Sequence, residues 1–259
     1  MRRFVAISLF ALGVTITTLA QTSTPNSPTS SHTLAPFSRA GLEGGVSLMG
    51  INLQAATDVD RHLNLRLNGN VFGYSVNNIN TNGFTFGGKL SLASMGVDLD
   101  YYPFPTHGLR LSPGLLLYNQ NSVSATGTVG AGTSFTVNNN NYYSSVSNPV
   151  QASATIGFHA TNPAFTLTTG WGNIISRTGG HVSFPFEIGV AFTGAPTVNF
   201  TLPQGQVCDY TGANCVNVST DQQLQSDVQA QIAKYKNDLN ALTVYPILSF
   251  GIGFNFPIR

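Results

Sequence analysis

Residues 181–192 read HVSFPFEIGVAF, and every second residue in this stretch is apolar. The apolar positions are Val182, Phe184, Phe186, Ile188, Val190 and Phe192. Because successive side chains of a β-strand point to opposite faces, the pattern predicts a strand with one strongly apolar face. A water-soluble protein would cover that face with a helix or a second sheet, so the rest of the chain decides where this strand lies.

The same alternation recurs along the chain from about residue 42. It is found in LNLRLNGNVFGYSV (63–76), FTFGGKLSLASMGVDLDYYPF (84–104), LRLSPGLLLY (109–118), VQASATIGFHA (150–160), FTLTTGWG (165–172), TVNFTLP (197–203) and VYPILSFGIGFNF (244–256). In the second stretch the apolar residues change phase, from Phe84–Leu92 at even positions to Met95–Tyr101 at odd ones. A one-residue shift of this kind predicts a β-bulge near Ala93 or Ser94.

One amphipathic helix is expected over about residues 221–242, where apolar residues recur at spacings of four and three. Thr220 or Asp221 can cap its start. One helix cannot cover eight or more apolar strand faces, so we expect lipid to cover them. Backbone groups within a bilayer must pair internally, and strands achieve this only by closing into a barrel.

The composition agrees with an exported membrane protein. Charged residues make up 8% of the chain, against about 25% in typical soluble proteins. Residues 1–20 have the basic start, apolar core and small-residue end of a cleaved signal peptide, and a flexible lead-in over 21–40 is expected to follow. The domain would then span residues 41–259. No basic cluster suggests binding to nucleic acid.

The predicted fold is therefore all-β: a closed antiparallel transmembrane β-barrel of 8–10 strands, with the helix in the last long loop. Counting 197–203 as a strand gives nine strands, and residues 34–45 would supply a tenth because single-chain bacterial barrels are even-numbered. If 197–203 is a loop, the count is eight. Short connections are expected on the periplasmic side, at 57–62, 103–108, 160–163 and 193–196. Long connections are expected outside the cell, at 76–83, 119–149, 173–181 and 203–243.

Several local sequences resemble those of a known group. These are DYYPF (100–104), GWGN (170–173) and IGVAFTGAPTVNF (188–200), followed by a Gln-rich helix and YPILSFGIGFNF (245–256). The chain resembles the poorly characterised outer-membrane β-barrel proteins of Gram-negative bacteria, similar in size to the outer membrane protein A and W types, over roughly residues 40–256. The resemblance implies an outer-membrane location, with lipid and the barrel assembly machinery as partners, and it supplies no catalytic motif.

Strand phase predicts a cluster of charges inside the barrel. Its members are Arg66, Lys89, Asp98, Asp100, Arg110 and Glu187. Our interpretation is an ion-paired filling of a narrow lumen, because barrels of about eight strands are filled by side chains. The alternative is the selectivity lining of a narrow channel.

Three further features are predicted from local sequence. An aromatic girdle at the membrane surfaces would contain Tyr101, Tyr102, Phe104, Trp171, Tyr245 and Phe256. Cys208 and Cys215 would form a local disulfide in an exported chain, with a metal pair as the weaker alternative. The polar stretch TVNNNNYYSSVSN (136–148) would be a mobile surface loop.

These patterns lead to three hypotheses of function. The first is a barrel with a structural or surface-interaction role, and the second is a narrow channel for small or apolar solutes. The third is a soluble secreted β-sandwich that binds a ligand, which would need two facing sheets. No catalytic residues, metal site or cofactor are expected, because the acidic residues and histidines show no suitable spacing. The oligomeric state is left open.

Overall fold

The computed structural model describes residues 35–81, 84–177 and 179–258. All elements named below belong to one compact unit within residues 34–259. The predicted signal peptide and most of the predicted lead-in lie outside the described residues.

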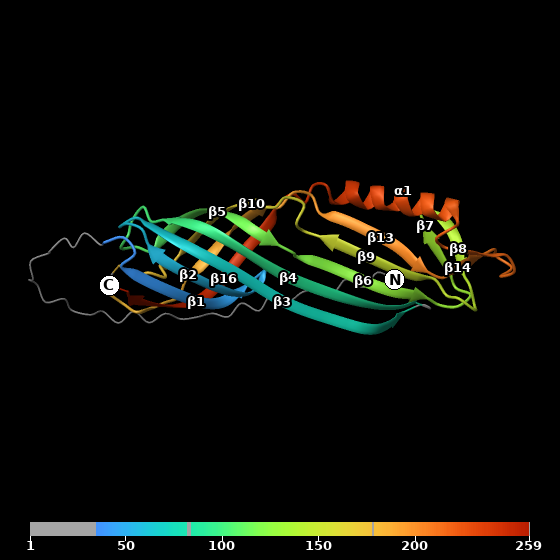
Figure 1. Ribbon diagram of the computed structural model, residues 1–259, viewed down its shortest axis with the longest axis horizontal. Coiled ribbons are helices and arrows are strands. Elements are labelled where there is room, and N and C mark those ends of the chain that lie inside the picture. The colour runs from blue at the N-terminus through green and yellow to red at the C-terminus, as the bar shows by residue number, and fades with distance from the viewer. Residues whose placement is uncertain (1–34, 82–83, 178, 259) are drawn as a thin grey trace, which may run out of the picture. The chain divides into compact units, whose positions relative to one another are not determined.

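Eight strands pair antiparallel into a closed ring, which makes this part of the chain a β-barrel (Figure 1). In ring order they are β1 (Arg39–Ser47), β2 (Gly50–Asp58), β3 (Leu63–Thr81), β4 (Phe84–Tyr101), β5 (Leu109–Asn119), β10 (Ala164–Trp171), β12 (Phe186–Phe192) and β16 (Tyr245–Pro257). The predicted closed antiparallel barrel is confirmed, at the lower end of the expected strand number. A closed ring also excludes the facing sheets that a sandwich requires.

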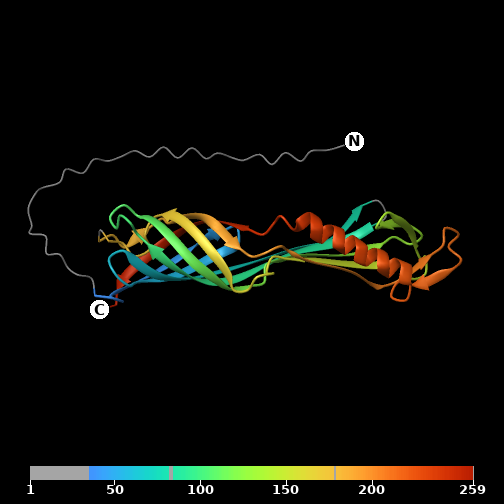
Figure 2. The same cartoon turned by 90° about the horizontal axis from the view of Figure 1, so that it is seen from above.

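β3 and β4 have 19 and 18 residues, about twice the nine of β1 and β2, and their far halves continue beyond the ring. There they join three further strands: β6 (Ser122–Val129), β9 (Gln151–Gly157) and β13 (Thr197–Gln204). We call this part the extension. It includes residues 72–81 and 84–93 of the long strands, and α1 (Gln222–Leu239) lies along its sheet over β13 (Figures 1 and 2).

A second, smaller sheet completes the extension. Its strands are β7 (Ser134–Val137), β8 (Asn140–Ser144), β14 (Gln206–Cys208) and β15 (Cys215–Asn217). The predicted disulfide is present and joins Cys208 of β14 to Cys215 of β15. The stretch 136–148 was expected to be a mobile loop. Instead its first part forms the β7–β8 hairpin, which packs against α1.

The extension changes the predicted topology. Residues 197–203 do form a strand, but β13 pairs with β9 outside the ring. Residues 160–163 and 193–196 were expected to be periplasmic turns. They are instead the points where the chain crosses between the extension and the ring, from β9 to β10 and from β12 to β13.

The segment 173–181 was expected outside the cell but lies at the end of the ring away from the extension. It lies beside the short connections 57–62 and 103–108, because Arg177 Nη2 donates to the carbonyl of Asp60 (2.9 Å) and the amide of Gly172 donates to the carbonyl of Gly108 (3.0 Å). The short strand β11 (Val182–Ser183) follows this segment and pairs with β16 just before β12 begins.

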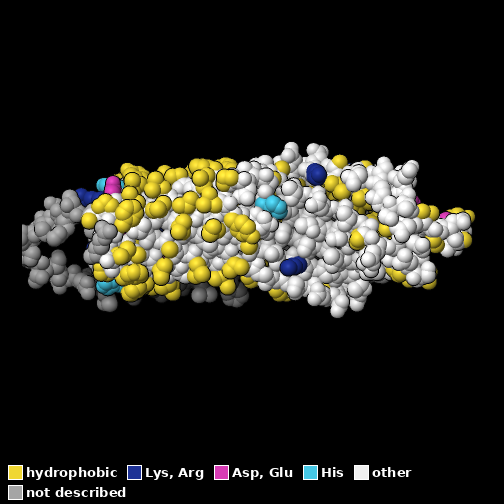
Figure 3. Space-filling view, viewed as in Figure 1, with side chains coloured by type: hydrophobic (Ala, Val, Ile, Leu, Met, Phe, Trp, Pro, Cys, Tyr) yellow, Lys and Arg dark blue, Asp and Glu magenta, His cyan; other side chains and the backbone are white. Residues whose placement is uncertain are grey.

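The opening stretch is thus two short strands, β11 and β12, separated by Phe184 and the buried Pro185. Val182, Phe184, Ile188 and Phe192 are exposed on the outer surface of the ring, and Glu187 points inward. On the face seen in Figure 3, apolar side chains gather over the ring, whereas few of them lie on the extension. Within the described ranges, no helix is long and apolar enough to cross a membrane.

The predicted phase change in β4 has a different cause from a bulge at Ala93 or Ser94. Buried positions alternate without interruption from Leu92 through Ser94 to Asp100, so the strand keeps one face inward. Near these residues the register of β4 shifts toward β5, between Met95 and Gly96, and a second shift lies toward β3, between Val76 and Ile79. The apolar residues change face because β4 leaves the ring. In the ring the inward face of β4 is polar and its outward face is apolar. In the extension the inward face packs in an apolar core and the outward face meets solvent.

The core of the extension is formed by the predicted helix. Asp221 caps α1 by accepting from the amide of Leu224 (2.9 Å), as expected, and the helix ends at Leu239 rather than near 242. Leu224, Val228 and Ile232 face the sheet and are buried with Val137 and Leu202 among others.

Candidate functional site

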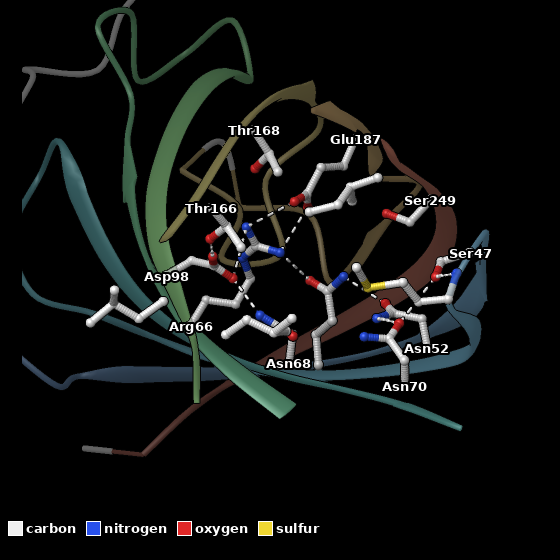
Figure 4. A pocket seen from close by; sticks show the side chains of 15 residues that line it. Ser47, Asn52, Arg66, Asn68, Asn70, Asp98, Thr166, Thr168, Glu187 and Ser249 are labelled. Carbon is white, nitrogen blue, oxygen red and sulfur yellow. Dashed lines mark hydrogen bonds and ion pairs between the residues drawn. The ribbon is translucent and has the colours of Figure 1, made fainter. Parts of the chain in front are cut away.

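The interior of the ring contains a network of buried charges centred on Arg66 of β3. Its Nε lies 3.0 Å from both carboxylate oxygens of Asp100. Its Nη1 donates to Glu187 Oε2 (2.8 Å) and to Gln54 Oε1 (2.9 Å), and Nη2 lies 3.4 Å from Asp98 Oδ2. One guanidinium therefore joins side chains from four strands across the ring (Figure 4).

Arg110 of β5 adds a second cation to the network. Its Nη2 donates to Glu187 Oε2 at 2.6 Å, so both arginines share one carboxylate oxygen. Asp100 also accepts from Ser112 (2.6 Å), and Asp98 from Asn68 (2.6 Å). A buried charge is tolerated only when it is paired and hydrogen-bonded, and each of these is.

A glycine makes room for one of the carboxylates. A Cβ placed on Gly114 of β5 would lie 2.0 Å from Asp98 Oδ1 and 2.7 Å from the hydroxyl of Thr166. A larger residue there would push Asp98 away from Arg66. The network thus depends on backbone positions as well as on its charged side chains.

Amide side chains continue the network toward the extension. Gln54 donates to Asn52 (2.6 Å), and Asn52 donates to Asn70 (2.8 Å), which also accepts from Ser47 (3.1 Å). Figure 4 shows these side chains lying along one wall of the ring interior. The cavity beside them is about 30 Å³, room for about two water molecules.

Clusters of apolar side chains are buried on both sides of the charges. Near the extension, Met49, Leu116, Ala164 and Ala191 are buried together. At the opposite end, Ile174 and Ile175 of the segment 173–181 are fully buried against Ala56. The buried charges therefore lie between two clusters of buried apolar side chains.

The structure changes the predicted set of charged interior residues in two ways. Lys89 was expected inside, but it is exposed on the extension and pairs in register with Ser75 and Ser124. The expectation assumed that a bulge turns β4 over at the phase change, whereas the strand keeps one face inward. Glu43 of β1 was missed, although it lies buried in the ring interior, because no strand phase had been assigned to residues 34–45.

The aromatic residues occupy three kinds of position. Tyr101, Phe104, Trp171 and Phe256 are exposed at the end of the ring away from the extension. Tyr102 was expected beside them but is fully buried, because it follows the outward-facing Tyr101 and so turns inward. Tyr245 lies at the extension end, half-buried near Phe158.

The pairing of the ring strands defines a closed eight-stranded antiparallel β-barrel. Among solved structures it is similar to CarO of Acinetobacter baumannii, with 22% identity over 87% of this chain and 100% of that chain, and a TM-score of 0.52. It is also similar to CarO2 of the same organism, with 17% identity over 86% of this chain and 100% of that chain, and a TM-score of 0.54. At these identities the likeness shows the fold alone. No family model and no curated protein matches the sequence.

Proposed function

We propose that this protein is an outer-membrane β-barrel that does not conduct, and that it holds its extension at the cell surface to contact molecules outside. The observation that carries the proposal is the network of buried charges between two apolar clusters, with a cavity of about 30 Å³ beside the charges. The buried apolar and charged side chains across the ring favour the structural or surface-interaction role over transport.

The outer surface of the ring supports a location in lipid. Exposed apolar side chains occur on all eight ring strands, among them Leu53, Leu67 and Phe250. A strand of about 9–11 residues spans a bilayer when tilted, which suits the nine residues of β1 and β2. The membrane partner is therefore outer-membrane lipid, with the barrel assembly machinery acting during insertion.

The orientation follows from the connections. Barrels of the outer membrane have short periplasmic turns and longer external segments. The connections β2–β3 and β4–β5 are short and lie at the end away from the extension, so the extension would lie outside the cell. Export would depend on the predicted signal peptide, residues 1–20.

Conductance in planar lipid bilayers tests whether the barrel is closed. The wild-type protein should give no discrete current steps under conditions in which a reference porin does. Discrete steps that change with Asp98→Asn, but not with Lys89→Gln, would overturn the closed barrel and support the narrow channel. Lys89→Gln is the matched control because it removes an expected lumen charge that lies outside the ring.

Amine labelling of intact cells tests the location and orientation. The three lysines of the sequence, Lys89, Lys234 and Lys236, all lie exposed on the extension. A membrane-impermeant amine reagent should label them in intact cells. Labelling only after lysis would contradict the external position of the extension. A mobility difference between unheated and boiled samples in detergent gels would test whether the barrel is folded.

A further inference from the structure

The sheet of the extension has one apolar face with a shallow floor. Small residues of the two middle strands lie side by side, because Gly127 of β6 pairs with Ala152 of β9 and Ala125 pairs with Ala154. Larger side chains stand on both sides, from Phe84 and Phe86 on β4 and from Phe200 and Leu202 on β13. The two walls and the floor form a trough across four strands.

The helix and the hairpin cover only part of this trough. α1 packs over β13, and its Leu224, Val228 and Ile232 are buried at that side. Phe135 and Val137 of β7 cover the trough from the hairpin side. A pocket of about 480 Å³ remains open between them, and Phe86 in its wall is 37% exposed.

The roof of the pocket is fixed by a polar clamp. Asp227 of α1 accepts hydrogen bonds from Asn138 (3.0 Å), Asn140 (2.6 Å) and Tyr142 (2.5 Å), all on the hairpin. One helical turn later, Gln231 accepts from the amide of Asn138 (3.0 Å). The hairpin is therefore held in place without a ligand, and the pocket is preformed, as small-molecule sites usually are.

The residues that line the pocket disfavour a charged ligand. None of the residues that line it is charged. The threonines among them alternate with the residues whose side chains face the pocket, and the hydroxyls of Thr85 and Thr136 donate to Asn80 and Asn141 instead. A charged ligand would lose its hydration and find no opposite charge. The other face of the same strands is different, because the hollow there is lined by Asn77, Gln151 and Ser153 among others.

We propose that the apolar pocket of the extension binds a small uncharged molecule with an alkyl or aryl body. The volume lies within the range of roughly 300–1,000 Å³ that holds such ligands, and the aromatic walls supply the contact surface. The uncharged lining argues for a neutral compound rather than a fatty acid or a charged peptide. The inference does not depend on whether the barrel conducts.

Photolabelling tests the proposal with the full chain in lipid nanodiscs. The probe is trifluoromethyl-phenyl-diazirine, which is neutral and apolar and reacts with C–H bonds when illuminated. Mass spectrometry should find saturable labelling on 84–86, 125–129, 135–137 or 152–154, competed by excess trifluoromethylbenzene. Outward-facing ring residues such as Leu53 should be labelled in proportion to probe concentration, which provides an internal control for partitioning into lipid.

Variants on the two faces of β9 make the test specific. Ala154→Phe fills the trough and should reduce saturable labelling about tenfold or more. Such a reduction corresponds to an affinity for the probe that is at least about tenfold lower. Ser153→Phe adds the same bulk to the opposite face and should leave it unchanged. Ala125→Leu on β6 is a second filling variant in case Ala154→Phe does not fold, as judged by gel mobility of unheated samples. Labelling of the pocket that does not saturate, or that persists in folded Ala154→Phe or Ala125→Leu, would overturn the proposal.

Discussion

β3 and β4 run through two regions in which the same strands are arranged in opposite ways. In the ring, Leu67 and Leu99 point outward and are exposed, whereas Arg66 and Asp98 point inward and are buried. In the extension, Phe84 packs inward toward α1, and Lys89 of the same strand points to the solvent. The difference teaches that an alternating pattern reports which environment each face of a strand meets, not which side of the sheet is the interior.

The two regions also differ in what holds them together. The middle of the ring interior is polar, and its Asp98, Asp100 and Glu187 carboxylates are paired with arginines. The extension has an apolar core between one helix and two sheets, like a small water-soluble domain. The same kind of substitution should therefore destabilise one region strongly and the other only slightly. The predictions below use matched pairs of such substitutions.

The largest effect is expected for the basic residues of the two regions. Arg66→Met removes the cation shared by Asp98, Asp100 and Glu187. The buried Asp98 and Asp100 then have no ion-pair partner, whereas Glu187 keeps Arg110. The free energy of unfolding should fall by about 3–5 kcal/mol. Lys89→Met, on the exposed face of the extension, should change it by less than about 0.5 kcal/mol. Urea unfolding in lipid vesicles measures both, and equal small losses would mean that Arg66 is not the centre of the interior.

A second pair tests which apolar surface faces lipid. Leu53 of β2 and Tyr74 of β3 have nearly the same exposure, 62% and 61%. Leu53→Arg places a charge near the middle of a ring strand and should cost about 2–4 kcal/mol if that strand lies in the bilayer. Tyr74→Arg lies on the extension and should cost less than about 0.5 kcal/mol. If Leu53→Arg is tolerated as well as Tyr74→Arg, the ring surface does not face lipid.

The closed barrel could be predicted from sequence because the requirement behind it is strict. Strands such as β12 carry more exposed apolar surface than one helix can cover, and backbone groups in lipid must pair within the protein. The helix and its cap were also predictable, since spacing and the Asp221 side chain are local signals. The disulfide could be predicted because the two cysteines lie seven residues apart in a chain that we expected to be exported.

The extension could not be predicted because its strands alternate in the same way as those of the ring. β9 and β13 have apolar residues at every second position, but those residues face α1 or the pocket rather than lipid. The decisive signal was the phase change in β4, which a bulge would also explain. Lys89 was placed inside for that reason. Tyr102 was wrongly placed on the outer surface. It lies one residue past the end of β4, and its side chain still follows the alternation of the strand and points inward.

The clamp between hairpin and helix should affect the extension without affecting the ring. Asp227→Ala removes the acceptor of Asn138, Asn140 and Tyr142, so hydrogen exchange of residues 134–144 should accelerate about tenfold or more, since hydrogen bonds to a charged group are strong. Exchange in β1 and β2 should not change. Tyr142→Phe removes one donor and should have a smaller effect. Equal acceleration in ring strands would mean that the two regions unfold as one.

The pH dependence of the clamp follows from the same hydrogen bonds. The bond from Asn138, with those from Tyr142 and Asn140, lowers the pKa of Asp227 below its usual range. A lowered pKa means that the stabilisation is present above the ordinary value of about 4 and is lost as pH falls through the folded value. Burial and the bond to Asp227 raise the pKa of Tyr142, so its contribution is lost only in strong alkali. Hairpin protection, corrected for intrinsic exchange, should therefore stay constant from about pH 5 to pH 9, and a loss within that window would contradict the clamp.

The smallest effect is expected at the start of α1. Asp221→Ala removes the side chain that accepts from the amide of Leu224, and loss of such a cap costs about 1 kcal/mol. The cost should appear as faster exchange in the first turn of α1, with Leu224 losing part of its packing on the sheet. Asp221→Asn keeps a capping oxygen and should restore most of the protection. Because α1 borders the proposed pocket, this variant also tests how much the helix contributes to ligand binding. Saturable labelling that survives Asp221→Ala would show that the sheet and the hairpin form the site. Loss of the saturable labelling would show that the first turn of α1 is needed to form the pocket.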